Sequence, residues 1–187
     1  MKNQYLEDVV IKNSGDRVSI SWQWGSAGSI AVDIYARKWD VDTGQGFGVF
    51  IQREPKLPGY AMADVELDRS VIAGGIYHFV FLPVIDSQAR PDQALTVENI
   101  RVGRHPQVTY TVTDTRDHKM AQIHFSITES RIPAGHLQVV SRASQMAYPL
   151  MKEIKDNSTF LMYGEHKADI EVEAKACYKE CYHISRG

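Results

Sequence analysis

The sequence predicts an all-β protein built from two β-sandwich domains in tandem. Apolar and polar residues alternate over short runs, which is typical of half-buried strands. Gly, Asp, Asn and Pro separate these runs, as expected of turns between strands. The length of 187 residues suits two domains of about 90 residues each.

Two long runs in the first half show the clearest strand pattern. Residues 17–24 place apolar side chains at every second position, namely Val18, Ile20, Trp22 and Trp24. Residues 29–38 repeat the pattern, with Ile30, Val32, Ile34 and Ala36 on one face and Asp33, Tyr35 and Arg37 on the other. A period of two directs each set to one side of a strand.

Five further runs complete the first half. They cover residues 9–12, 48–53, 61–67, 76–85 and 95–102. Together with the two runs above they make seven strands in about 100 residues, which is the number expected of an immunoglobulin-like sandwich. We therefore expect a first domain at residues 1–103.

Two segments of this half resemble the fibronectin type III family. The segment VSISW, Val18 to Trp22, is similar to the second strand of that fold, whose tryptophan fills the core. The segment IYHFVFLPV, Ile76 to Val84, is similar to its sixth strand, with Tyr77, Phe79 and Phe81 directed inward. The resemblance covers about residues 5–103. It implies an interaction or spacer module without a catalytic site, so it assigns no functional residues.

A new series of alternating runs begins after Pro106. Strands are predicted at residues 108–112, 123–127, 137–140, 159–163, 170–174 and 177–184, and a short helical turn within 146–155. Because Pro restricts the residue before it, the Gly103–Pro106 stretch predicts a domain boundary. We expect a second, divergent immunoglobulin-like or fibronectin type III-like β-sandwich at residues 104–187.

The composition excludes several classes of protein. A net charge of −2 gives no basic field for nucleic acid. No apolar run approaches the length needed to span a bilayer, and the first eight residues lack the apolar core of a signal peptide. With only two cysteines, these features favour a cytoplasmic protein, or a secreted one if a leader has been removed.

The metal-like patterns have ordinary explanations. Asp40, Asp42 and Gly44 resemble the start of a calcium loop, but Ile51 stands where the closing glutamate belongs. Cys177 and Cys181 lie near His183, but four residues along a strand separate side chains by roughly 13 Å. We therefore predict no metal site and no cofactor. No catalytic residues are nominated either, which favours a protein that is not an enzyme.

Two groups of residues remain as candidate binding sites. The aromatic side chains of Trp24, Trp39 and Tyr35 are candidates for ligand binding. The strand at 76–85 has a second side, formed by His78, Val80 and Leu82, that is also largely apolar. A sandwich core covers only one side of a strand, so this side needs another contact. That side predicts a contact with the other domain, or an interface with a partner protein or a second copy.

These observations leave three functional hypotheses. The first is a non-enzymatic interaction or structural module that acts through protein–protein contacts as an accessory to a larger assembly. The second is a carbohydrate-binding module associated with polysaccharide degradation, because exposed aromatic rings bind sugars. The third is a small hydrolase with its site at the domain junction.

Overall fold

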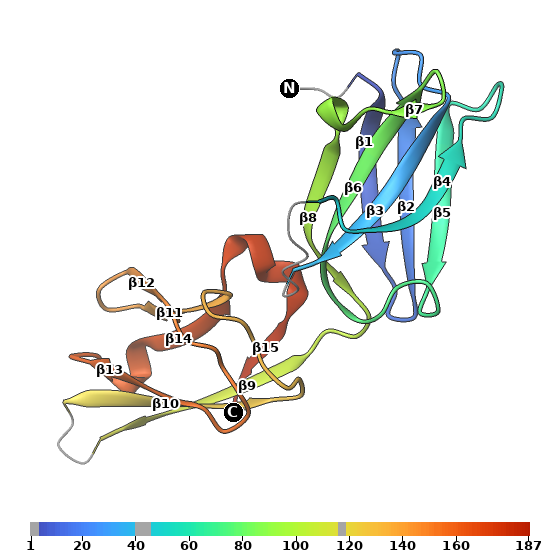
Figure 1. Ribbon diagram of the computed structural model, residues 1–187. Coiled ribbons are helices and arrows are strands. Elements are labelled where there is room, and N and C mark those ends of the chain that lie inside the picture. The colour runs from blue at the N-terminus through green and yellow to red at the C-terminus, as the bar shows by residue number, and fades with distance from the viewer. Residues whose placement is uncertain (1–3, 40–45, 116–118) are drawn as a thin grey trace. The chain divides into compact units, whose positions relative to one another are not determined.

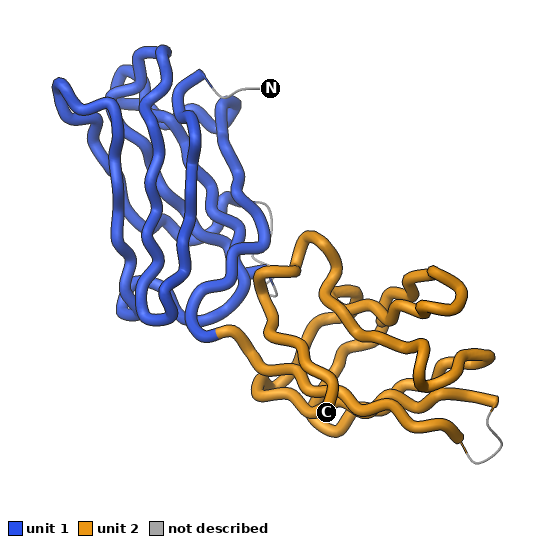
Figure 2. The backbone as a smooth tube through the Cα atoms, turned by 180° about the vertical axis from the view of Figure 1, so that it is seen from behind, with its two compact units in different colours: residues 1–104 blue, residues 105–187 orange. Residues whose placement is uncertain are grey.

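The chain divides into two compact units, residues 1–104 and 105–187, which Figure 2 colours separately. The computed structural model describes residues 4–39, 46–115 and 119–187. Within them the regular structure is β-strand, apart from three short 3-10 turns, η1 (Pro91–Gln93), η2 (Lys167–Asp169) and η3 (Ala176–Cys181).

Unit 1 is a sandwich of two antiparallel sheets. One sheet has the order β1-β2-β5, from Leu6–Asn13, Arg17–Trp24 and Met62–Asp68. In the other, β3 (Ala31–Lys38) lies between β4 (Val49–Pro55) and β6 (Gly75–Ile85), and β8 (Leu95–Val102) and the short β7 (Gln88–Ala89) pair with β6. A three-stranded sheet that faces a five-stranded sheet, in which β7 has only two residues, makes a fibronectin type III-like sandwich, as the sequence predicts (Figure 1).

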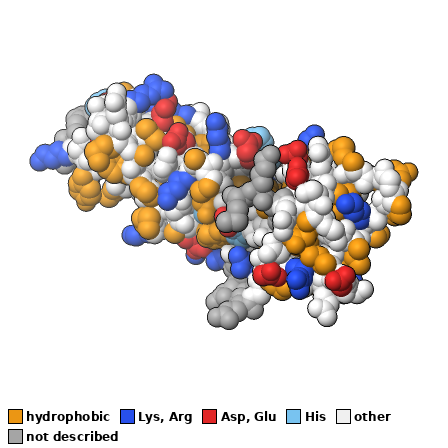
Figure 3. Space-filling view, turned by 90° about the horizontal axis from the view of Figure 1, so that it is seen from above, with side chains coloured by type: hydrophobic (Ala, Val, Ile, Leu, Met, Phe, Trp, Pro, Cys, Tyr) orange, Lys and Arg blue, Asp and Glu red, His pale blue; other side chains and the backbone are white. Residues whose placement is uncertain are grey.

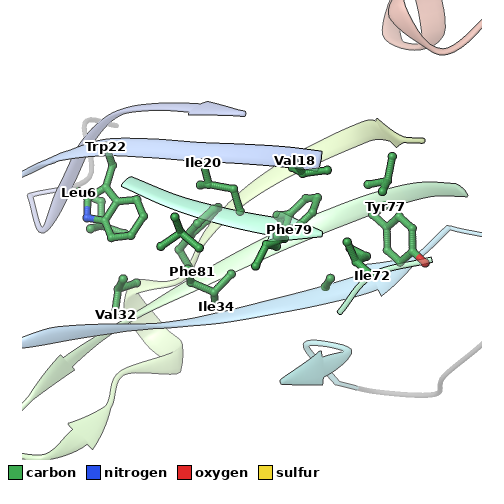
Figure 4. Packing of buried hydrophobic residues seen from close by; sticks show 14 residues of the cluster. Leu6, Val18, Ile20, Trp22, Val32, Ile34, Ile72, Tyr77, Phe79 and Phe81 are labelled. Carbon is green, nitrogen blue, oxygen red and sulfur yellow. The ribbon is translucent and has the colours of Figure 1, made fainter. Parts of the chain in front are cut away.

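The core of unit 1 is filled by the alternating residues that the sequence singles out. The Trp22 side chain is 1% exposed, and its ring lies 6.3 Å from that of Phe81 on the opposite sheet. Phe79 and Phe81 are fully buried, and Tyr77 is nearly so. Figure 4 shows these rings directed between the sheets, with Ile20 and Ile34 among them. The inward set of the predicted sixth strand is therefore confirmed.

Unit 2 is a second sandwich with a different order of strands. One sheet is β13-β10-β9-β15, from Thr159–Tyr163, Met120–Ile127, Gln107–Asp114 and His183–Arg186. The other is β12-β11-β14, from Met146–Pro149, Leu137–Ser141 and Ile170–Ala174. The last strand, β15, runs parallel to β9, whereas the other pairings are antiparallel.

Two local predictions in unit 2 are wrong. Residues 146–149 form the strand β12 and not a helical turn, because all four of them pair with residues of β11. The predicted strand at 177–184 is the turn η3 followed by β15, so the strand begins only at His183. Cys177 and Cys181 lie on this 3-10 turn, so the separation of roughly 13 Å expected for a strand does not apply to them.

Candidate functional site

Three connections meet at one end of unit 1. They join β2 to β3, β4 to β5, and β6 to β8, and they lie at the opposite end of the sandwich from Val102 (Figure 1). Antiparallel strands place alternate connections at alternate ends, which is why these three gather. In immunoglobulin variable domains, loops at one end of the sandwich form the binding surface. We call this end of unit 1 the loop end.

The loop end contains an apolar hollow of about 450 Å³. It is lined by residues 29–30 and 56–61. Three of its lining side chains are largely exposed, Ile30 at 52%, Leu57 at 53% and Tyr60 at 65%. Met62, at the start of β5, is 60% exposed. On the face seen from above, hydrophobic side chains are spread among polar and charged ones (Figure 3).

Local backbone bonds shape this hollow. The Lys56 amide donates to the Ile30 carbonyl at 2.8 Å, which ties the two loops together. The Tyr60 amide donates to the Leu57 carbonyl at 3.2 Å and closes a turn. Gly59 occupies that turn with a φ of +82°, a conformation that side chains with a Cβ rarely adopt. The turn therefore holds Leu57 and Tyr60 at the surface.

Trp24 links this end to the core. Its ring meets that of Trp22 edge to face, with centroids 5.6 Å apart. The Lys56 ammonium lies 5.7 Å from the centre of the Trp24 ring, within range of a cation–π interaction. Trp24 is partly buried and packs against the core cluster of unit 1. It therefore supports the loop end and does not present a free platform.

Tyr35 lies elsewhere, on the outer face of the β4-β3-β6-β8 sheet. Its ring is 5.4 Å from that of Phe50 and 5.9 Å from that of Phe47. Phe50 is 51% exposed on the strand β4, whereas Tyr35 is partly buried. The Tyr35 and Phe50 planes meet at 69°, so the two rings do not form one flat surface.

The predicted interface residues share this sheet face with Tyr35. In the strand register, Val80 pairs with Tyr35, and Arg37 pairs with His78. Val80 is only 5% exposed and Leu82 only 2%. Both side chains are thus covered within the chain, and they offer little surface to a partner in this conformation. Their role in an interface stays a prediction.

Charged groups border these buried side chains. Asp33, the cross-strand neighbour of Leu82, is 3% exposed and accepts two hydrogen bonds from Arg53, at 2.5 and 2.8 Å. These bonds and the charge of Asp33 raise the pKa of Arg53. Burial lowers the pKa of His78, and Arg37 adds to that effect while Glu98 opposes it. One ion pair, Asp33–Arg53, therefore lies beside the buried Val80 and Leu82 on this face.

The three candidate aromatic residues do not share a surface. Trp24 ends β2 before the loop that leads to β3, and Trp39 follows β3 at the strand's other end, where its amide donates to the Ile76 carbonyl at 2.8 Å. The eight residues of β3 correspond to about 26 Å of strand. Tyr35 lies on the outer sheet face between them, so no single ligand-binding platform includes all three.

The described residues contain no group of three or more His, Cys, Asp or Glu side chains that could hold a metal ion. The calcium-like stretch at 40–44 lies outside the described residues. Cys177 is exposed and Cys181 is buried, and no disulfide joins the two. Among the described residues, no helix is long and apolar enough to cross a membrane.

Sequence reasoning missed the residues that line the hollow. The sequence alone assigns no role to Leu57 and Tyr60, which lie between the strands predicted at 48–53 and 61–67. Their position between two predicted strands could have identified them. A turn between two strands lies at the surface, so large apolar residues within it are exposed.

Comparisons with known proteins assign no function. No protein-family model and no curated protein matches this chain. A solved structure that it is similar to is a segment of two fibronectin type III domains from chicken tenascin, with 10% sequence identity. The match covers 90% of each chain with a TM-score of 0.36. The description of unit 1 therefore depends on its own strand order.

Proposed function

We propose that this chain is a non-enzymatic module that acts through protein–protein contacts, with the loop end of unit 1 as its docking surface. Sandwiches of the fibronectin type III kind commonly serve protein interaction. In this reading the chain is an accessory to a larger assembly and performs no chemistry of its own.

The observation that carries the proposal is the exposure of Ile30, Leu57 and Tyr60 around the hollow. Contact between water and large apolar side chains is unfavourable, and burial of these side chains in an interface would remove that contact. Tyrosine is also among the residues that contribute most to binding energy in interfaces. Lys56 adds one cation beside the hollow, which favours a partner with a carboxylate at the rim of its contact surface.

Site-specific photo-crosslinking in cells tests this proposal. A photoreactive phenylalanine analogue replaces Tyr60 in one variant and Leu57 in a second. In a control variant it replaces Glu66, an exposed residue of β5 outside the hollow. We expect the same discrete protein adduct from positions 60 and 57 and none from 66. Equal adducts from all three positions, or none from 60 and 57, would contradict the docking role.

Carbohydrate binding is the second candidate, and Tyr60 is its best support. Its ring is the most exposed aromatic side chain at the hollow, where a sugar ring could stack. A glycan array with the wild-type chain and the Tyr60→Ala variant separates the two functions. Binding to a defined glycan that disappears in Tyr60→Ala would favour the carbohydrate function over the protein-interaction function.

A further inference from the structure

Two histidine rings of unit 2 lie close together, near the start of that unit. His105 precedes β9, and His183 is the first residue of β15. Their ring centroids are 4.9 Å apart, with the planes inclined by 53°. His183 is exposed and His105 partly so, which leaves the pair accessible from solvent. We propose that His105 and His183 bind one late first-row transition-metal dication, such as Zn²⁺, as a two-nitrogen chelate.

The separation of the rings fits two imidazoles bound to the same ion. A Zn–N bond of about 2.0–2.1 Å places an imidazole centroid roughly 3.2 Å from the metal. For N–metal–N angles of about 90–110°, the two centroids then lie roughly 4.5–5.2 Å apart. The observed 4.9 Å falls within this interval.

A hydrogen bond also prepares His105 as a ligand. Its Nε2 lies 2.7 Å from the carbonyl oxygen of Glu180. A carbonyl oxygen only accepts, so Nε2 must carry the hydrogen. In the neutral ring the lone pair is then on Nδ1, where a metal can bind. Metal-binding histidines usually donate their other N–H to a carbonyl or carboxylate in this way.

The backbone holds the second histidine beside the first. The His183 amide donates to the Pro106 carbonyl at 3.0 Å, and in the parallel ladder His183 pairs with Gln107. His105 is thus bonded to the segment that precedes His183, and His183 is bonded to the residue that follows His105. A bound ion would join the first residue of unit 2 to its last strand.

The ligand set determines which ions fit. Within the residues that the structure describes, no third His, Cys, Asp or Glu completes a cluster. Water would therefore fill the remaining positions, and the ion would exchange readily. Imidazole nitrogen suits Zn²⁺, Ni²⁺ and Cu²⁺, whereas Mg²⁺ and Ca²⁺ prefer oxygen ligands. The pair therefore selects the former group.

Isothermal titration of the full chain with ZnCl₂ tests the proposal. We expect one Zn²⁺ per chain, and no binding of MgCl₂ under the same conditions. His105→Gln and His183→Gln should each weaken Zn²⁺ binding at least tenfold. His124→Gln and His166→Gln are matched controls, because these histidines lie elsewhere on unit 2, beside Thr159 and Asp114, and should bind within twofold of the wild type.

A second measurement keeps the test decisive if a variant is misfolded. Substoichiometric Ni²⁺ is added to the wild-type chain, and we expect NMR ring signals of His105 and His183 to broaden before those of His124 and His166. The proposal is overturned if Zn²⁺ gives no saturable binding. It is equally overturned if both Gln variants bind like the wild type, if other signals broaden first, or if one ion binds per two chains.

Discussion

The two units solve the same packing problem with different interiors. Unit 1 closes around an apolar cluster in which Trp22, Phe79 and Phe81 are almost fully buried. Unit 2 buries apolar residues such as Ile123 and Phe125, and it also buries His136 and Ser141 completely, whereas the buried Asp33 of unit 1 lies outside that unit's apolar cluster. A sandwich core therefore tolerates polar groups where the fold supplies them with partners.

The polar interior of unit 2 lies where the chain changes sheets. In unit 1 the last strand, β8, stays beside β6 in the same sheet. In unit 2 the turn η3 carries the chain from β14 in one sheet to β15 in the other. His136 lies against this passage, with its ring stacked on Tyr178 at 3.8 Å and its Nδ1 2.6 Å from the Tyr182 hydroxyl. The buried histidine therefore helps to hold the crossing segment.

The largest expected effect concerns the core of unit 1. Trp22→Ala should cost about 3–5 kcal/mol of stability, because it opens a cavity between the sheets. Urea unfolding followed by tryptophan fluorescence measures this, since all three tryptophans lie in unit 1. Trp22→Phe, which retains an aromatic ring, is the matched control and should cost less. An unchanged midpoint in Trp22→Ala would show that the ring does not support the core.

The corresponding change in unit 2 removes one hydroxyl. Tyr182→Phe should cost about 1–3 kcal/mol, because the buried His136 loses a hydrogen-bond partner. Amide hydrogen exchange of β11 and β14 reports this loss within unit 2. Tyr163→Phe is the control, since that side chain is 76% exposed, and it should leave exchange unchanged. Equal effects of the two variants would mean that the His136–Tyr182 contact contributes little.

Acid should weaken unit 2 through His136. Burial, together with the charge of Lys175, lowers the pKa of His136 from 6.5 to about 4. The unfolded chain therefore binds a proton that the folded unit does not bind between these values. The free energy of unfolding is therefore unaffected by His136 above about pH 6.5, and it decreases as the pH falls from there toward 4. Hydrogen exchange of unit 2 at pH 7 and 4.5, corrected for intrinsic rates, should show the loss, and His136→Gln should reduce it.

The smallest expected effect is on stability at the loop end. Tyr60→Ser should change the unfolding free energy by less than about 0.5 kcal/mol, because the side chain is exposed and the Gly59 turn remains. Tryptophan fluorescence in urea measures it as for Trp22. A loss comparable to that of Trp22→Ala would place Tyr60 in the folded core and would remove the argument for a docking surface.

Local periodicity determined most of the strands. The run at 17–24 and the run at 95–102 coincide with β2 and β8, and the aromatic set of the sixth strand is buried as predicted. The candidate site was less predictable. Trp22 and Trp24 share one periodicity, yet only Trp22 is fully buried, because Trp24 lies beside the loops where the core ends. Periodicity describes a strand's faces and carries no information about its ends.

The sequence by itself determined the all-β class, the two-part organisation and the inward face of the first unit, because alternation is a property of neighbouring residues. Only the tertiary structure decided that β15 joins β9, that η3 interrupts the last predicted strand, and that His105 meets His183. It also decided that Leu57 and Tyr60 border one hollow with Ile30. These features join residues far apart in the chain, and their proximity arises from strand pairing that no local pattern encodes.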